Sequence, residues 1–423
     1  MKKHSLKRIL STGLILAIIN YTSAFSNYLF HLISGRILTL DSFGQLQSLI
    51  NLNTIVGMLV SAVGPAIILF FSSIDDNNIK SNLKLVEKKI FSISFFTSIL
   101  LIVLYLPLKL LLKIQSDIYL IWIVQVAASV FYLLYLSVFQ SKLKLIIYAL
   151  SGLFFSILKN IFSILFSFTA IRALGPYLSP ALTTVIMAIC LKILISEIWP
   201  SKNYTAIKSD TSISFWKYSF SALLTNTFLI FVISQDIFIV RYYFSETTSG
   251  IYSSASIIGK IILYAVSPIT IYLFPLYIKY RNDIQKLKYM LYTSTLAIIA
   301  VTTIASIIYK LYSDAIINLL LGTKFSESAK ILPVYAVFIS IYSVLFHVCQ
   351  FFLSRKSSLS YKIPISIFLT QSLLLYLFHQ NSKQVILMST ISMPLGVISL
   401  SLLTLLRQLY HRVLGRFVSR RFL

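Results

Sequence analysis

Two lysines lie inside long apolar runs, where a fixed positive charge is costly. Lys159 falls near the middle of the run 145–169, and Lys260 falls near the middle of the run 250–277. A lysine at the centre of a membrane helix costs roughly 2.5–3.5 kcal/mol, so it is expected to face a bundle interior or water. Helical spacing puts hydroxyl groups on the same faces: Ser156, Ser163 and Ser167 beside Lys159, and Ser253, Ser256 and Tyr264 beside Lys260. This pattern suits an anionic, hydroxyl-rich ligand, and it equally suits a snorkelling or carbonyl-bonded lysine among packing serines.

A polar stripe in the first apolar run and a single acid are further candidates. The stripe has the spacing of one helix face and leads towards Arg36; it consists of Asn20, Ser23, Asn27 and His31. It is typical of a cavity lining or of hydrogen bonds to neighbouring helices. Asp236 is the only acid that we place inside a membrane span. It is suited to taking up a proton or sodium ion, or to pairing with Arg241.

Composition sets the environment of these residues. The chain has 423 residues, of which 57% are hydrophobic and 12% charged, and its mean hydropathy is +0.86. A chain so apolar would expose large apolar patches to water, so a bilayer is its expected solvent. The net charge of +25 sits in short clusters between apolar runs, which favours loops at a membrane surface over nucleic-acid binding. No phosphate-binding loop, HExxH motif or Cys/His cluster occurs, so we expect no catalytic residue, metal or cofactor.

Twelve apolar runs are long enough to predict membrane helices. They are 10–34, 46–71, 90–112, 118–140, 145–169, 173–196, 214–238, 250–277, 289–311, 331–354, 363–380 and 386–406. If the N-terminus is cytoplasmic and every run crosses, 26 of the 37 Lys and Arg residues fall in inner segments and 9 in outer ones. This follows the positive-inside rule. We therefore predict an all-α polytopic membrane protein with both termini cytoplasmic and a basic amphipathic tail over 407–423.

One phrase occurs twice, about two hundred residues apart. Arg36, Asp41 and Gly44 follow the first run, and Arg241, Glu246 and Gly250 follow the seventh. Each copy ends the first helix of a set of six, so the two sets have the same orientation in the membrane, as in parallel-repeat transporters. We predict an N-lobe over 1–205 and a C-lobe over 206–406, related as pseudo-symmetric six-helix bundles that enclose a central cavity. Pro65 and Pro268, in the returning helix of each hairpin, are candidate kinks.

Three stretches carry a resemblance to a known family. They are "GRILTLDSFGQLQSLINL" from Gly35, "QDIFIVRYYFSETTSGIYSSASIIGKI" from Gln235 and "LLLGTKFSESAKILPVY" from Leu319. They resemble elements of the polysaccharide-exporter and O-antigen flippases, within the superfamily that also holds multidrug antiporters and the lipid II flippase. Lipid II flippases usually have fourteen helices, so twelve favours the polysaccharide branch.

The resemblance implies transport of undecaprenyl-diphosphate-linked oligosaccharide across the bacterial inner membrane. It makes Lys159, Lys260, Arg36, Arg241, Asn20, Asn27, His31 and Tyr264 candidate substrate ligands, and Asp236 a candidate ion-coupling residue. The expected partners are the lipid-linked substrate, membrane lipids, a polysaccharide polymerase and chain-length proteins. Two other readings stay open: a membrane glycan polymerase or O-acyltransferase, and a small-molecule efflux antiporter of the same superfamily. Short outer loops disfavour the enzyme, and membrane lysines in place of acids disfavour a cation exporter.

Overall fold

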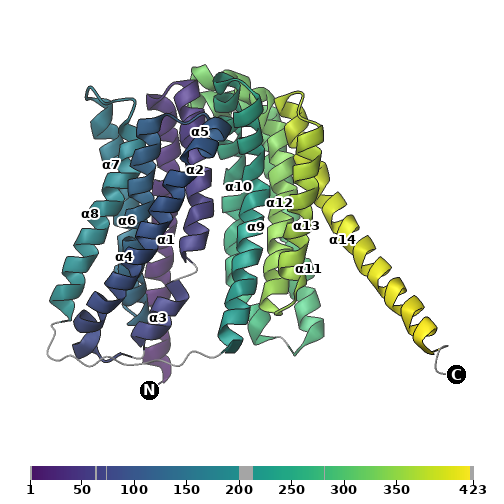
Figure 1. Ribbon diagram of the computed structural model, residues 1–423, viewed down its shortest axis with the longest axis horizontal. Helices are drawn as coiled ribbons and strands as arrows, with labels where there is room; N and C mark the ends of the chain where they lie inside the picture. Colours follow the sequence, from purple (N-terminus) through teal and green to yellow (C-terminus); the bar gives the residue numbers. More distant parts are fainter. Residues whose placement is uncertain (1, 62–63, 73, 200–212, 281, 420–423) are drawn as a thin grey trace. The chain divides into compact units, whose positions relative to one another are not determined.

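The computed structural model describes residues 2–61, 64–72, 74–199, 213–280 and 282–419 (Figure 1). Within these residues the secondary structure is entirely helical. The α-helices are α1 (Lys2–Ile37), α2 (Leu40–Ser61), α3 (Gly64–Ser72), α4 (Ile79–Val103), α5 (Tyr105–Leu112), α6 (Ser116–Ser141), α7 (Leu145–Ser167), α8 (Gly175–Ile198), α9 (Ile213–Tyr243), α10 (Glu246–Lys279), α11 (Ile284–Leu320), α12 (Leu332–Ser354), α13 (Leu359–Leu377) and α14 (Ser382–Ser419). Two short 3₁₀ helices, η1 (Asp76–Asn78) and η2 (Thr323–Lys330), lie between them.

Each of the twelve predicted runs falls on one helix or on a consecutive helix pair. Among the described residues, eight helices are long and apolar enough to cross a membrane, or nine if the bent α4–α5 pair is one span. The all-α polytopic class is therefore confirmed. The count of twelve spans stays a prediction, because α1, α2 and α13 are not among those eight helices.

Breaks in the helices have local causes. The axis bends by 57° between α4 and α5, where Pro107 stands in the first turn of α5. Proline has no backbone N–H and its ring clashes with the carbonyl four residues earlier, so it favours a bend or break at this point. Of the two predicted kinks, Pro65 lies at the start of α3. Pro268 lies inside α10, which is continuous.

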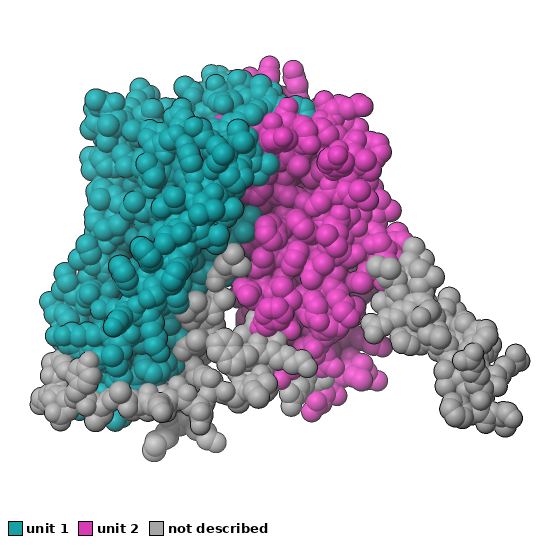
Figure 2. Space-filling model, in the orientation of Figure 1, with its two compact units in different colours: residues 1–212, 244–253, 318–325 teal, residues 213–243, 254–317, 326–423 magenta. Residues whose placement is uncertain are grey.

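The chain divides into two compact units, coloured separately in Figure 2. The first contains residues 1–212, 244–253 and 318–325, and the second contains residues 213–243, 254–317 and 326–423. In the first unit α1 packs on α7, and α8 packs on both α6 and α7. In the second, α13 packs on α9, α12 and α14. The predicted lobe boundaries at 205 and 406 stay predictions.

An apolar core of the first unit joins α3, α4, α6 and α8. Phe71 of α3, Phe139 of α6 and Ile195 of α8 are all fully buried in it. The rings of Phe139 and Trp199 lie 5.6 Å apart between centroids, so the end of α8 is fixed against α6. This core holds α6 and α8 in place, and both helices also line the cavity described below.

The two copies of the repeated phrase touch each other within the first unit. A Cβ atom added to Gly44 would lie 2.8 Å from the backbone nitrogen of Gly250, and one added to Gly250 would overlap the carbonyl oxygen of Leu40. Thr247 Oγ1 donates a hydrogen bond to Asp41 Oδ1 at 2.8 Å across the same contact. Each phrase therefore carries a glycine because the backbones at the starts of α2 and α10 meet directly, which only small residues permit.

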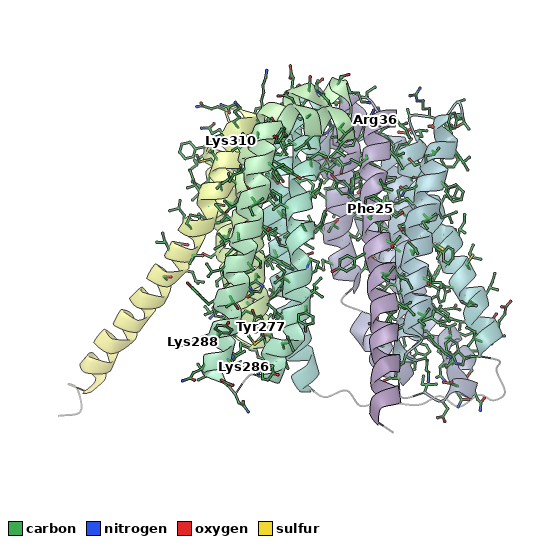
Figure 3. All side chains as sticks on the ribbon, turned by 180° about the vertical axis from the view of Figure 1, so that it is seen from behind. Phe25, Arg36, Tyr277, Lys286, Lys288 and Lys310 are labelled. Atoms are coloured by element: carbon green, nitrogen blue, oxygen red, sulfur yellow. The ribbon has the colours of Figure 1, made fainter. Side chains whose placement is uncertain are left out.

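The positions of the lysines of α11 are consistent with a single membrane crossing by this helix. Figure 3 labels Lys286 and Lys288 at the first end of α11, near Tyr277, and Lys310 towards the opposite end. The charge distribution predicted Lys286 and Lys288 for the inner side and Lys310 for the outer side. Lys310 therefore lies towards the opposite end of α11 from Lys286 and Lys288, as the prediction requires.

Candidate functional site

Lys159 is held between α7 and α1. Its side chain is buried, with 9% of the residue exposed, and its Nζ donates a hydrogen bond to Asn27 Oδ1 at 2.8 Å. The same Nζ lies 4.4 Å from the centroid of the Phe30 ring, which supplies a cation–π contact. The adjacent Asn160 fixes the register of the two helices, because its Nδ2 donates to the carbonyl oxygen of Ser26 at 2.7 Å. The structure thus brings together two of the predicted ligand residues, Lys159 and Asn27.

A cavity of about 170 Å³ lies beside Lys159 within the first unit. Its lining comes from α1, α2, α6, α7 and α8, and within the described part of the chain this lining contains no aspartate or glutamate. The polar and aromatic lining residues are Phe30, His31, Asn53, Trp122, Gln125, Phe155, Lys159 and Tyr177. Trp122 Nε1 donates to Asn53 Oδ1 at 3.3 Å, so the walls contributed by α6 and α2 are linked.

Only part of the polar stripe of α1 reaches this cavity. His31 is part of the lining, and Asn27 is bonded to the lysine that projects there. Asn20 lies further back along α1; it is exposed and is not in the lining. The structure therefore brings Asn27 and His31 to the cavity and leaves Asn20 away from it.

Lys260 occupies a different environment in the second unit. It is half-buried in α10, and the carboxylate of Asp236 in α9 acts on it electrostatically. Asp236 is fully buried and forms a hydrogen bond with Tyr335 of α12, whose hydroxyl accepts one from Ser256 Oγ at 2.7 Å. Ser256, Tyr335 and Asp236 thus form a chain of hydrogen bonds that leads to the neighbourhood of Lys260.

A glycine and a tyrosine on α10 flank this chain. A Cβ atom at Gly259 would lie 2.5 Å from Cδ1 of Tyr335, so the absence of a side chain at this position lets the tyrosine ring rest against α10. Tyr264, the remaining predicted ligand of this face, lies one turn beyond Lys260 and is 58% exposed.

The two repeated arginines have unlike positions. Arg36, at the end of α1, is exposed, and its guanidinium donates to the carbonyl oxygen of Leu319 at 2.6 Å (Figure 3). It therefore satisfies a carbonyl group at the C-terminal end of α11. Arg241, its counterpart in α9, is fully buried in the second unit. The sequence predicted the same role, that of a substrate ligand, for both.

A further cationic cluster surrounds Arg36. The pKa of Lys324 is lowered, first by burial and then by the positive charges of Arg172 and Arg36. Lys324 donates hydrogen bonds to the carbonyl oxygens of Leu38 and Arg36, which hold it at this position. The first unit therefore gathers three cations from distant parts of the sequence, of which only Arg36 was predicted as a ligand.

Sequence reasoning missed several residues of both sites. Trp122, Gln125 and Tyr177 line the first cavity, and Tyr335 belongs to the second cluster. Gln125 offered a signal, because it is an amide in the middle of an apolar run. The aromatic residues offered none, since they resemble ordinary packing residues. In the described part of the chain no group of three His, Cys, Asp or Glu side chains is placed to hold a metal ion.

Comparisons with solved structures identify the fold. No protein-family model matches the sequence, and no curated protein matches it either. The lipid II flippase MurJ, in an inward closed conformation, matches with a TM-score of 0.67 and 14% identity over 92% of this chain and 86% of that chain. An outward-facing multidrug resistance MATE transporter of the MOP superfamily matches with a TM-score of 0.61 and 13% identity over 93% of both chains. An inward-facing MATE transporter matches at 0.60, with 11% identity over 89% and 95%. The chain therefore has the fold of these membrane transporters.

Proposed function

We propose that this protein is a flippase that moves undecaprenyl-diphosphate-linked oligosaccharide from the cytoplasmic to the outer leaflet of the bacterial inner membrane. The substrate would be an O-antigen unit or another surface-polysaccharide repeat unit. The fold supports a transporter, since it is shared with a lipid II flippase and with multidrug transporters. The observation that carries the substrate class is Lys159, a buried membrane cation beside a cavity in which none of the described lining residues is an acid.

The physical requirement is to keep a charged, hydrated head group out of hydrocarbon. A flippase for such a lipid needs fixed cations for the phosphates or acidic sugars and hydrogen-bonding groups for the neutral sugars. Lys159 and Lys260 supply the cations; Asn27 and His31 of α1 supply polar groups near Lys159, and Tyr264 supplies one on the helix of Lys260. Arg36 and Arg241 would receive phosphate near the outer surface, and Asn20 would contact the head group near the middle of α1.

Transport would proceed by alternating access between lobes 1–205 and 206–406 around a central cavity. Asp236 is the proposed site of ion coupling. Its buried carboxylate is near the Lys260 ammonium, and a proton or sodium ion could take the place of that ammonium in balancing the negative charge. Both termini would be cytoplasmic, and the basic tail over 407–423 would lie on the anionic inner leaflet. A polysaccharide polymerase and chain-length proteins would take up the exported unit.

Deletion of the gene tests this proposal directly. We expect the lipid-linked repeat unit to accumulate on the cytoplasmic leaflet, because its head group cannot cross hydrocarbon unaided. Complementation with Lys159→Gln should restore export poorly, and complementation with the unmodified gene should restore it fully. A deletion strain with a normal leaflet distribution but increased sensitivity to a cationic drug would overturn the proposal and favour efflux.

A further inference from the structure

Lys159 is the cation of the first-unit cavity. It lines the cavity from α7 and His31 does so from α1, and none of the lining residues that the structure describes is an aspartate or glutamate. The lysine ammonium has three N–H donors, and Asn27 accepts one of them. The remaining donors are suited to an anionic group on a ligand, since a buried ammonium is stabilised most by an ionised acceptor.

The size of the cavity limits this ligand. A volume of about 170 Å³ equals that of about six water molecules at ~30 Å³ each. It is also smaller than the ~300–1,000 Å³ of sites for drug-sized molecules. The part of a ligand that these walls surround is therefore about the size of a single sugar ring.

The walls have the composition of a site for a sugar ring. Four helices each contribute one aromatic side chain: Phe30, Trp122, Phe155 and Tyr177. Aromatic faces carry partial negative charge and attract the C–H groups of a pyranose. The amides of Gln125 and Asn53 offer both donors and acceptors for its hydroxyl groups.

The same features disfavour a diphosphate in this cavity. A diphosphate carries at least two negative charges and is normally held by several cations or backbone N–H groups. Here it would meet one buried ammonium and four aromatic rings whose faces repel anions. One carboxylate opposite one ammonium balances the charge.

We infer that this cavity is a binding subsite for one acidic sugar residue, a pyranose whose carboxylate pairs with Lys159 and whose ring lies among the aromatic walls. The inference rests on the proposed function, because it assigns part of the transported glycan to a place in the first unit. It narrows the substrate class from lipid-linked oligosaccharides in general to repeat units that contain a carboxylate-bearing sugar.

Fluorescence of Trp122 provides the test. The chain has three tryptophans, so a Trp199→Phe, Trp216→Phe background leaves Trp122 as the only indole, at the cavity wall. The purified full chain is titrated with methyl β-glucuronide and with methyl β-glucoside, which differ by the carboxylate. We expect saturable quenching by the glucuronide and an affinity for the glucoside that is roughly 10- to 100-fold lower, the range expected for a hydrogen bond to a charged group.

Single substitutions test whether Lys159 is the group that binds the glucuronide carboxylate. Lys159→Met should lower the glucuronide affinity to that of the glucoside, and Lys159→Arg should retain most of it. Lys310→Met is the matched control, because it removes the same charge from an exposed position near the far end of α11 (Figure 3); it should leave binding unchanged. Equal quenching by both sugars, no quenching by either, or a loss of affinity in Lys310→Met as large as in Lys159→Met would overturn the inference. Pyrophosphate that binds as tightly as the glucuronide would instead assign the cavity to the diphosphate.

These outcomes separate the subsite from the transport function. Glucuronide binding by purified protein requires no lipid and no translocation. If the deletion strain accumulates the lipid-linked unit but the glucuronide does not bind, the subsite is wrong and the flippase proposal stands. If the glucuronide binds but the leaflet distribution is unchanged on deletion, the cavity is a sugar site and the flippase proposal is wrong.

Discussion

The two membrane lysines differ in what balances their charge. Lys159, in the first unit, has an amide and aromatic rings as neighbours, and the described residues that line its cavity include no acid. Lys260, in the second unit, is near the buried carboxylate of Asp236, which Tyr335 also contacts. Both residues looked alike in the sequence, as single lysines among hydroxyl groups. We therefore expect the two lysines to have different roles. The first lysine would bind a ligand anion, and the second, together with Asp236, would respond to binding of an ion or proton.

The largest effect is expected from separating the pair in the second unit. Lys260→Met would remove an ammonium that acts electrostatically on the buried Asp236 carboxylate, and if the two form a buried pair it should cost about 3–5 kcal/mol of stability. The double variant Lys260→Met, Asp236→Asn should recover most of this loss, because no charge is then left uncompensated. Thermal unfolding of the single and double variants in detergent measures the coupling. Additive losses would show that the two side chains do not form a pair.

A smaller effect is expected from disturbing Tyr335 without removing a charge. Gly259→Ala would place a methyl group against the ring of Tyr335 and should cost about 1–3 kcal/mol, as overpacking usually does. Gly57→Ala is the control, because a Cβ atom there meets nothing within 4 Å and alanine favours a helix by up to ~1 kcal/mol. If Asp236 couples ion uptake, Gly259→Ala should also alter ion-driven transport in vesicles, and Gly57→Ala should not.

Replacement of Lys159, unlike replacement of Lys260, should change stability little and activity strongly. Lys159→Met is expected to change stability by no more than about 1 kcal/mol, because relief from burying an ammonium offsets the lost hydrogen bond to Asn27. Glycan export should nevertheless fall sharply. A stability loss as large as that of Lys260→Met, with export unaffected, would remove the distinction between the two sites.

The smallest effect is expected at a surface ion pair, which serves as a reference for the buried one. Lys142 Nζ lies 3.0 Å from Asp76 Oδ1, and the aspartate side chain is 68% exposed. The Lys142 hydrogen bond is the main cause that lowers the pKa of Asp76 below its usual 3.8. The stabilisation is therefore present above pH 3.8 and is lost as the pH falls through the lowered pKa.

Asp76→Asn should cost only ~0.5 kcal/mol at neutral pH, the usual size for an exposed pair, and the cost should shrink in high salt. Thermal unfolding of the variant and the unmodified chain at pH 7 and near pH 3 measures it. A loss at pH 7 comparable to that of Lys260→Met would mean that exposure does not separate the two pairs.

Long apolar runs and their charged ends were sufficient to predict the helices. Each run requires a helix in a bilayer, because only a helix satisfies its own backbone hydrogen bonds there. The same periodicity placed Asn27 and His31 on one face of the first helix, and the structure brings both to the cavity of Lys159. Asn20, on the same face, lies elsewhere, because a straight helix is longer than the cavity that it lines.

Which helices meet could not be predicted, because helical periodicity carries no information about neighbours. Trp122, Gln125 and Tyr177 lie on α6 and α8, and their role follows only from the packing of those helices around α7. The repeated arginines show the same limit. Arg36 is exposed against the end of α11, and Arg241 is buried, although their local sequences correspond.

The sequence by itself determined that this chain is a helical membrane protein with two costly lysines and a duplicated turn, since hydropathy and spacing are local properties. Only the tertiary structure decided that the duplicated glycines meet each other, that Asn27 accepts a hydrogen bond from Lys159, and that Asp236 lies near Lys260. The reason is that the energy of a buried charge depends on the groups folded around it, and those groups come from segments far apart in the chain.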